Sequence, residues 1–306
     1  MSSLFAFPGQ GAQQVGMLQR LPEGCGHLLE EASDVLGQQV LGMDSQQALQ
    51  NTRAVQLCLL LSGVAWARWL MQRSPSPDYV AGLSIGAYPA AVVAGALGFA
   101  DAVRLVALRG ELMQGAYPQG YGMTALSGLD LNSVERLLIE VGGEVYVANL
   151  NSENQIVIAG SDAAMAEVAA RARRRGQGVA RRLAVSVPSH CPLLDRPAAA
   201  LADAFATVEL QRPRIMYLSG SSARPVYDPQ RLRDDLAGNM ARVVDWRATL
   251  RNAYERGVRL HLEMPPGSVL SGLARPVFEQ GRVVTVEGTR WDTLDALLRQ
   301  EVAQNR

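Results

Sequence analysis

The chain has 306 residues, 48% of them hydrophobic and 19% charged, and its 29 basic and 29 acidic residues give a formal net charge of zero. This length and balance predict a globular protein with a substantial core, and they exclude a general electrostatic attraction to nucleic acid or to an anionic membrane. All 29 basic residues are Arg, which excludes Schiff-base, pyridoxal and P-loop chemistry that depends on a lysine.

The first part of the chain alternates between strand and helix patterns. SLFAFPGQG predicts a short buried strand that ends at Pro8, and YVAGLS predicts a second strand over residues 79–84. The predicted helices cover residues 27–37, 53–71, 85–97 and 101–115. Alternation of this kind is typical of a parallel α/β sheet.

One uncharged stretch, residues 79–100, is long enough to span a bilayer. It contains four glycines after its first strand-like residues, and Pro89 falls in the first turn of the predicted helix. These features favour a buried strand, turn and helix over a membrane span.

The pattern then changes to the order β-α-β-β-α-β. Strands are predicted over residues 121–129, 144–150, 155–161 and 178–186, and helices over 131–141 and 162–175. This is the split ferredoxin-like order. We therefore expect a small domain at 122–187, inserted into a large domain made of residues 1–121 and 188–306.

After this insertion the alternation of strand and helix resumes. Helices are predicted from about residue 192 and over 230–241, 246–257 and 292–303, with strands over 214–220 and 259–266. The predicted fold class is therefore α/β, with a parallel sheet in the large domain and a ferredoxin-like small domain.

Three cysteines, Cys25, Cys58 and Cys191, are far apart and form no C-x-x-C pair. This spacing predicts neither a disulfide framework nor a metal site, and it fits a reducing cytoplasm. The first residues, MSSLFAFPG, lack the basic segment and the long apolar segment of a secretory signal.

Ser84 stands in the sequence Gly82-Leu83-Ser84-Ile85-Gly86, between a predicted strand and a predicted helix. A nucleophile in the G-x-S-x-G pattern needs a sharp turn, where small flanking residues avoid a clash. The N–H groups that follow can stabilise an oxyanion. The alternative interpretation is an ordinary structural turn.

A serine nucleophile needs a base, and the chain has only three histidines. His27 falls in an early helix and is expected at the surface, and His261 alternates with leucines in a predicted strand and is expected to be structural. His190 lies in VSVPSHCPLL, where two prolines break regular structure. A histidine on a rigid loop is well placed to face a cleft, although a plain loop histidine remains the alternative.

Arg109 falls within the apolar stripe of its predicted helix, on the face that carries Leu105, Leu108 and Leu112. A carboxylate is the natural partner of a guanidinium in such a place. The functional interpretation of Arg109 is a clamp for a substrate carboxylate. The structural interpretation is a side chain that forms an internal salt bridge or extends toward solvent.

Two further segments have both a functional and a structural interpretation. PGQGAQQVG, residues 8–16, lacks the third glycine of the dinucleotide fingerprint and a P-loop lysine, so it offers either backbone oxyanion donors or a simple turn. A basic cluster in the small domain is either a solvated helix end or a binding patch for an acidic carrier protein or for phosphates. It consists of Arg171, Arg173, Arg174, Arg175, Arg181 and Arg182.

Seven segments, taken in order, resemble malonyl-CoA:acyl-carrier-protein transacylases. They are FPGQGAQ, TRAVQL, GLSIGAYPAAVVAGAL, LRGELMQ, NSENQIVIAG, VSVPSHCPLL and LHLEMPPGSVLSGL, and they extend from residue 5 to about residue 275. The resemblance implies an α/β-hydrolase-like large domain with a ferredoxin-like small domain.

The same resemblance implies roles for individual residues. Ser84 would be the acylated nucleophile, His190 its base, and Arg109 the partner of the malonyl carboxylate. The oxyanion hole would come from the backbone N–H groups of Gln10 and Ile85.

Two more positions follow from the family pattern. Gln56 falls where relatives often have a polar residue near the site. The family orients its histidine with a backbone carbonyl, expected here near Asp245 in VVDWR, and whether the Asp245 side chain contributes is open. The implied substrates are malonyl-CoA and the phosphopantetheine-type thiol of an acyl carrier protein, with no bound cofactor and no metal.

Leu83 departs from the family, which usually has His before the nucleophile. GLSIGAYPAA resembles the transacylase (epsilon) subunit of bacterial malonate decarboxylase, which implies transfer of malonyl to the carrier subunit of that enzyme. The alternatives are the transacylase of fatty-acid or polyketide synthesis, a thioesterase or esterase, and a non-catalytic scaffold that binds a carrier.

Overall fold

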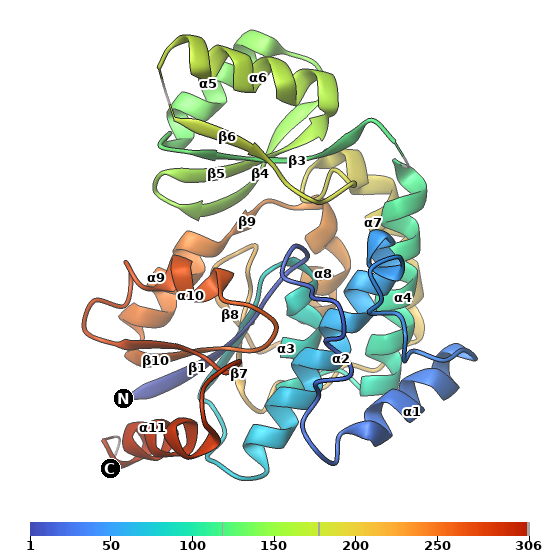
Figure 1. Ribbon diagram of the computed structural model, residues 1–306, viewed down its shortest axis with the longest axis vertical. Coiled ribbons are helices and arrows are strands. Elements are labelled where there is room, and N and C mark those ends of the chain that lie inside the picture. The colour runs from blue at the N-terminus through green and yellow to red at the C-terminus, as the bar shows by residue number, and fades with distance from the viewer. Residues whose placement is uncertain (118, 177, 305–306) are drawn as a thin grey trace.

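The computed structural model describes residues 1–117, 119–176 and 178–304, which build two sheets (Figure 1). In the large sheet every neighbouring pair of strands is parallel except the last pair, β7 with β8. In spatial order its strands are β11 (Arg282–Thr285), β10 (Val258–Glu263), β1 (Ser2–Phe7), β2 (Tyr79–Gly82), β7 (Met216–Leu218) and β8 (Pro225–Val226).

Helices cover both faces of the large sheet. Alternate residues of a strand point to opposite faces, so each strand contributes to two cores. Phe5 and Phe7 of β1 pack into one core, and Leu4 and Ala6 pack into another. The first core includes residues of α1 (Gly26–Leu36), α2 (Thr52–Met71), α3 (Ala87–Val93), α4 (Phe99–Ala116), α7 (Asp195–Ala204), α8 (Pro229–Gly238) and α11 (Trp291–Ala303). The second includes residues of α9 (Trp246–Glu255) and α10 (Val269–Ala274).

Within the described residues, α2 is the one helix that is long and apolar enough to cross a membrane. Of its most apolar stretch, 78% is buried inside the protein. Its side chains belong to the first core, which is the environment of a core helix. The uncharged stretch over residues 79–100 forms β2, a turn and α3, all largely buried.

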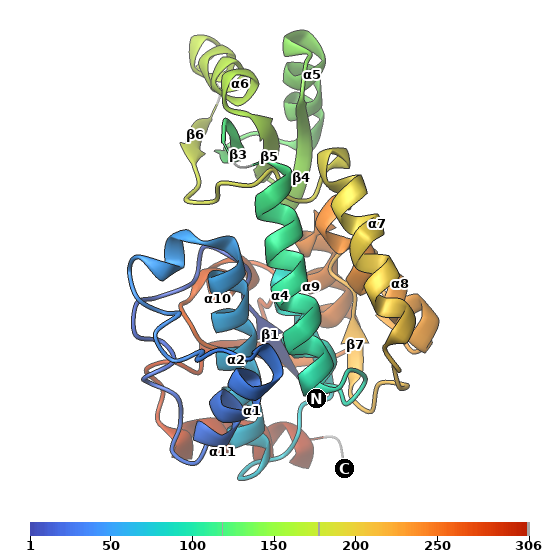
Figure 2. The same cartoon turned by 90° about the vertical axis from the view of Figure 1, so that its right-hand side faces the viewer.

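The small sheet has the strand order β6-β3-β5-β4-β9, and its first four strands are antiparallel. Numbered along the insertion, the first four lie in the order 4-1-3-2, with both helices packed on one side (Figures 1 and 2). The elements are β3 (Tyr121–Ser127), α5 (Leu131–Val141), β4 (Val145–Ser152), β5 (Gln155–Ser161), α6 (Asp162–Arg174) and β6 (Val179–Arg182). The mixed α/β fold with a large and a small part is therefore confirmed.

The fifth strand of the small sheet, β9 (Val244–Asp245), comes from outside the insertion and pairs in parallel with β4. No sequence pattern predicts it, because two residues have no periodicity to detect. We propose the division into residues 122–187 and residues 1–121 with 188–306 as the domain boundaries, and β9 joins the two parts.

The predicted helix over residues 85–97 is shorter than expected. The chain forms a 3₁₀ turn at Ser84–Gly86 and then α3, which ends at Val93 ahead of the left-handed Gly95. The other 3₁₀ turns are Ala48–Gln50, Pro192–Leu194, Phe205–Thr207 and Asn239–Ala241.

Candidate active site

Ser84 lies just beyond the carboxyl end of β2, at the turn that leads into α3. Its φ of 56° is left-handed, a conformation that a residue with a Cβ rarely adopts. Such strain is maintained only where the surrounding structure enforces it, and it is concentrated at functional sites. The turn thus has the geometry of a nucleophile elbow.

The two glycines of the motif allow this turn to pack tightly. A Cβ on Gly82 would overlap the carbonyl group of Gly86, and a Cβ on Gly86 would overlap the carbonyl oxygen of Phe7 at the end of β1. The small residues around Ser84 are therefore required by backbone contacts within the elbow and between β2 and β1.

His190 reaches Ser84 from a segment 106 residues away in sequence. Its Nε2 lies 2.8 Å from Ser84 Oγ, and its Nδ1 lies 2.7 Å from the carbonyl oxygen of Asn239 and 3.2 Å from that of Arg242. Two carbonyl acceptors at Nδ1 require that this nitrogen carries the proton. Nε2 is then free to accept the hydroxyl hydrogen of Ser84.

Burial keeps the imidazole of His190 neutral. The side chain is 2% exposed, and burial, helped by the charge of Arg109, lowers its pKa from 6.5 to about 4. At neutral pH the Nε2 lone pair is therefore available to a proton. The other two histidines lie elsewhere: His27 is exposed beside Gly24, and His261 is buried within β10.

Arg109 of α4 is 1% exposed and lies directly behind Ser84. Its Nη2 donates to Ser84 Oγ at 3.3 Å and to Asn239 Oδ1 at 3.0 Å, and its Nη1 donates to Gln56 Oε1 at 2.7 Å. Its Nε is buried without an acceptor, and in the described part of the chain no carboxylate comes within ion-pairing distance of it. Burial lowers the pKa of Arg109 to about 10, so the guanidinium stays charged at neutral pH.

Asn239 contacts all three groups, and no sequence pattern singles it out. Its carbonyl accepts from His190, its Oδ1 accepts from Arg109, and its Nδ2 donates to the carbonyl oxygen of Ser84 at 3.1 Å. Gln56, by contrast, lies where the family pattern implies, on Arg109, and its Nε2 lies 3.3 Å from Met113 Sδ.

Asp245 does not orient the histidine. Its carboxylate accepts from the N–H of Ala248 at 2.8 Å and so caps the start of α9, and it lies 3.6 Å from Arg247. The carbonyls at His190 belong to Asn239 and Arg242 instead, three to six residues earlier in the chain. A backbone acceptor leaves no side-chain signature, so its position could not be fixed from the sequence.

Gln10 and Ile85 lie on neighbouring strand ends. β1 and β2 pair in parallel, and the N–H of Leu83 donates to the carbonyl of Phe7 at 3.0 Å, which brings the loop after β1 beside the elbow. Gln10 lines the cavity at Ser84. Ile85 is fully buried, but its N–H is in the first turn of a helix, where N–H groups have no intrahelical acceptor.

A cavity of about 750 Å³ opens at Ser84 and His190 between the two sheets. Its walls are mostly apolar, and Leu83 and three residues of α10 contribute to them. Asn149 and Asn151 of β4 also line it, and the Oδ1 of each is buried with no hydrogen-bond donor from the residues that the structure describes. Arg109 and Gln56 do not line this cavity but lie behind Ser84.

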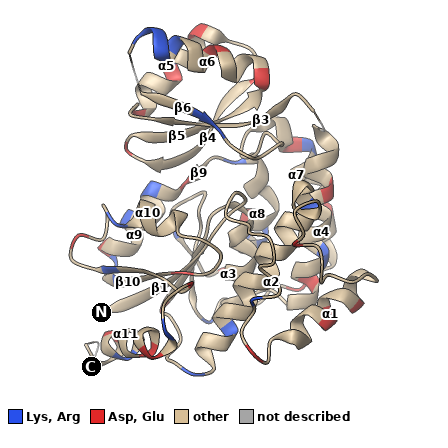
Figure 3. Cartoon of the chain, viewed as in Figure 1, with Lys and Arg blue, Asp and Glu red and all other residues tan. Residues whose placement is uncertain are grey.

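Figure 3 shows the basic residues of α6 and β6 in blue, and most of this cluster is paired with acidic side chains. Arg171 and Arg174 bind Glu167, Arg175 binds Glu140, and Arg182 binds Asp162. Of the six arginines, only Arg173 and Arg181 have no side-chain acceptor among the described residues, and Arg181 lines the cavity. The cluster is thus mainly a charge-balanced helix end.

Among the described residues, no three His, Cys, Asp or Glu side chains gather as a potential metal site.

Comparison with known families matches nearly the whole chain to one family. The profile of the family described as "Acyl transferase domain" matches residues 4–304. A malonyl CoA-acyl carrier protein transacylase of Haemophilus influenzae is 36% identical over 291 residues, which cover 92% of this chain and 93% of that protein. A protein of the same description from Bacillus subtilis is 31% identical over 92% of each chain.

Solved structures agree with the sequence comparison. A crystal structure of FabD from Acinetobacter baumannii matches with a TM-score of 0.90 at 37% identity, covering 99% of both chains. A malonyl-transacylase in complex with its type II PKS acyl-carrier protein matches with a TM-score of 0.89 at 34% identity, covering 98% of this chain and 100% of that one.

The tight packing at the elbow can be tested with one added methyl group. Gly86→Ala should destabilise the protein by about 1–3 kcal/mol or more, because its Cβ must displace the Phe7 carbonyl. Gly115→Ala in α4 is the matched control, since a Cβ there meets nothing within 4 Å and alanine favours a helix. Denaturant unfolding of both variants measures the effect, and equal stability of the two would contradict the packing argument.

Proposed function

The chain belongs to the acyl transferase domain family, and on that premise we propose that it transfers malonyl from malonyl-CoA to the thiol of an acyl carrier protein. Ser84 is the nucleophile and His190 its base. The observation that carries the proposal is the buried, charged guanidinium of Arg109, which has no carboxylate partner among the described residues. It lies 3.3 Å from Ser84 Oγ, whose hydroxyl donates to Nε2 of His190. A serine ester that ends in a carboxylate fits this arrangement.

In the first half-reaction Ser84 Oγ attacks the thioester carbonyl carbon of malonyl-CoA, and Nε2 of His190 takes the hydroxyl proton. The oxyanion that forms accepts hydrogen bonds from the N–H groups of Gln10 and Ile85, each worth about 2.7–4 kcal/mol in sites of this kind. The C–S bond then breaks, and the CoA sulfur leaves with the proton from His190.

In the second half-reaction the thiol of the carrier attacks the malonyl-Ser84 ester. His190 removes the thiol proton and returns it to Ser84 Oγ as the C–O bond breaks, which gives ping-pong kinetics. Apolar walls, including Leu83, limit the access of water to the ester. This feature favours transfer over the hydrolysis that a thioesterase would catalyse.

Arg109 holds the malonyl carboxylate. Its Nε has no acceptor in the described part of the chain, and its Nη2 uses Ser84 Oγ as one of its two acceptors. A carboxylate at this edge accepts from Nε and Nη2 together, in the bidentate geometry that guanidinium groups favour. Gln56 and Asn239 fix the remaining edge of the guanidinium.

Asn149 and Asn151 are suited to the phosphopantetheine arm that CoA and carrier proteins share. Their Oδ1 atoms are buried acceptors in the wall of the cavity. Such atoms are costly unless a ligand supplies donors, and the amide N–H groups of the arm are donors of this kind. Asn149 and Asn151 therefore serve both half-reactions.

The carrier that accepts malonyl is a finer question. The relatives named above are malonyl CoA-acyl carrier protein transacylases, whereas the proposal of a malonate decarboxylase carrier rests on Leu83 and its neighbours alone. We also propose a cytoplasmic location, because Cys25, Cys58 and Cys191 are all free and buried.

Acylation of Ser84 is tested by intact-mass measurement after mixing with malonyl-CoA. The wild type should gain one malonyl group, and Ser84→Ala should gain none, because the nucleophile is gone. The adduct should disappear on addition of a carrier thiol faster than in buffer alone. A wild type without an adduct, or a Ser84→Ala variant with the same adduct, would rule the scheme out, and rapid loss in buffer would favour a hydrolase.

The selectivity of the enzyme for malonyl-CoA over acetyl-CoA tests whether Arg109 binds the malonyl carboxylate. In Arg109→Ala the preference for malonyl-CoA over acetyl-CoA, measured as the ratio of kcat/KM values, should fall by about one to two orders of magnitude. This corresponds to the cost of about 1–3 kcal/mol for an unpaired buried charge. Arg104→Ala is the control, since Arg104 lies on the same helix but is exposed and pairs with Asp101 at the surface. An unchanged ratio in Arg109→Ala would exclude the clamp.

Malonyl transfer to two purified carriers, measured side by side, tests the acceptor. If Leu83 marks a malonate decarboxylase subunit, the carrier subunit of that enzyme should be acylated with the higher kcat/KM. A clear preference for the carrier of fatty-acid synthesis would overturn that assignment and leave the transacylase chemistry intact.

A further inference from the structure

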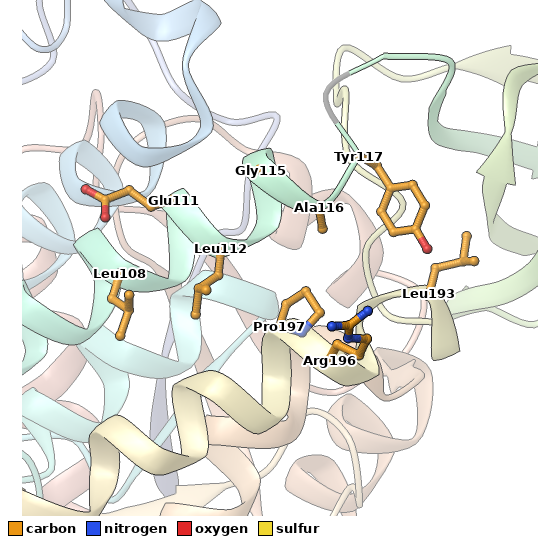
Figure 4. A pocket seen from close by; sticks show the side chains of 9 residues that line it. All are labelled: Leu108, Glu111, Leu112, Gly115, Ala116, Tyr117, Leu193, Arg196 and Pro197. Atoms are coloured by element: carbon orange, nitrogen blue, oxygen red, sulfur yellow. The ribbon is translucent and has the colours of Figure 1, made fainter.

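A second cavity, of about 490 Å³, lies between α4 and the start of α7 (Figure 4). It shares no lining residue with the cavity at Ser84. Its volume falls within the range of ordinary small-molecule sites. The transfer reaction described above makes no use of it.

One wall of this second cavity is an apolar row along α4. Leu108, Leu112 and Ala116 are spaced four residues apart, so they lie along one face of the helix. Eight residues at the helical rise give the row a length of about 12 Å. Leu193 and Pro197 form the facing wall (Figure 4). An extended aliphatic chain matches this shape and polarity.

The charged end of the cavity is Arg196. Figure 4 shows its guanidinium directed into the space between α4 and Leu193, with the hydroxyl of Tyr117 on the same side. Neither group has a hydrogen-bond acceptor or an ion-pair partner in the parts of the chain that the structure describes. The acid in the lining, Glu111, points away in Figure 4 and pairs with Arg53 at 2.7 Å.

From this combination we propose that the cavity between α4 and α7 is a second ligand site, which takes an aliphatic carboxylate of medium chain length. The chain lies along Leu108, Leu112 and Ala116, and the carboxylate accepts hydrogen bonds from Arg196 and Tyr117. The proposal is independent of the malonyl transfer chemistry, because it involves neither Ser84 nor His190.

The site adjoins both segments that hold the candidate active site. Leu108 precedes Arg109 in α4, and Leu193 follows His190 by three residues. A ligand here therefore contacts the helix that carries the guanidinium and the turn that follows the imidazole. This position makes the site suited to regulation of the enzyme by a bound aliphatic carboxylate.

Calorimetric titration of the full chain with hexanoate, octanoate and decanoate tests the site. Affinity should rise about fourfold for each added methylene, as burial of an aliphatic chain requires. Decanoate should bind at least tenfold more weakly to Arg196→Gln, and Leu112→Trp, which fills the groove, should abolish binding. Thermal unfolding checks that both variants are folded. Because Arg196 is exposed, Arg196→Gln should not alter the stability of the fold.

Two control variants show whether decanoate binds at this site alone. Arg173→Gln removes an exposed arginine on α6 and should bind decanoate as the wild type does. Ser84→Ala changes the other cavity, at a residue on neither α4 nor α7, and should also bind decanoate, since the two cavities are separate. Absence of binding to the wild type, equal binding by Arg196→Gln, or loss of binding in Ser84→Ala would each overturn the proposal.

Discussion

The hydrogen bond between Ser84 Oγ and His190 Nε2, 2.8 Å long, is the contact on which the rest of the site depends. It joins two loops whose backbones are both left-handed, with φ of 56° at Ser84 and 65° at His190. The elbow is held against β1 at Gly86, and the N–H of His190 donates to the carbonyl of Met240 at 2.6 Å. The packing of the elbow against β1 and the hydrogen bond to Met240 therefore maintain the left-handed conformations of these two residues.

Burial lowers the pKa of both titratable partners of Ser84, with different outcomes at neutral pH. It keeps His190 neutral, whereas Arg109 stays charged and has no carboxylate partner among the described residues. Arg109 itself lowers the pKa of His190. A substrate carboxylate at Arg109 would offset that charge and make the imidazole a stronger base. The acid group of the substrate would thus promote the proton transfer that forms its own ester, which a neutral acyl group could not do.

The sequence could predict those features that leave a periodic pattern or a characteristic side chain in the chain. The alternation of strands and helices predicts the two-part α/β fold, and the flanking glycines and proline-bounded loop single out Ser84 and His190, which the structure brings together. Features that depend on backbone groups could not be predicted from the sequence. Strand β9 is two residues long, and the carbonyl at His190 belongs to Asn239, six residues before the expected Asp245. Asn239 also joins three distant segments, which no local pattern reveals.

The state of the His190 ring tests the central claim most directly, through ¹⁵N and ¹H NMR of the imidazole as a function of pH. The account predicts a proton on Nδ1 and a bare Nε2, with the ring neutral at pH 6 and charged only as the pH falls toward its pKa of about 4. Above that pH the Nε2 signal should shift in Ser84→Ala, because its hydrogen bond is lost. A proton on Nε2, or an imidazolium already formed at pH 6.5, would contradict the account.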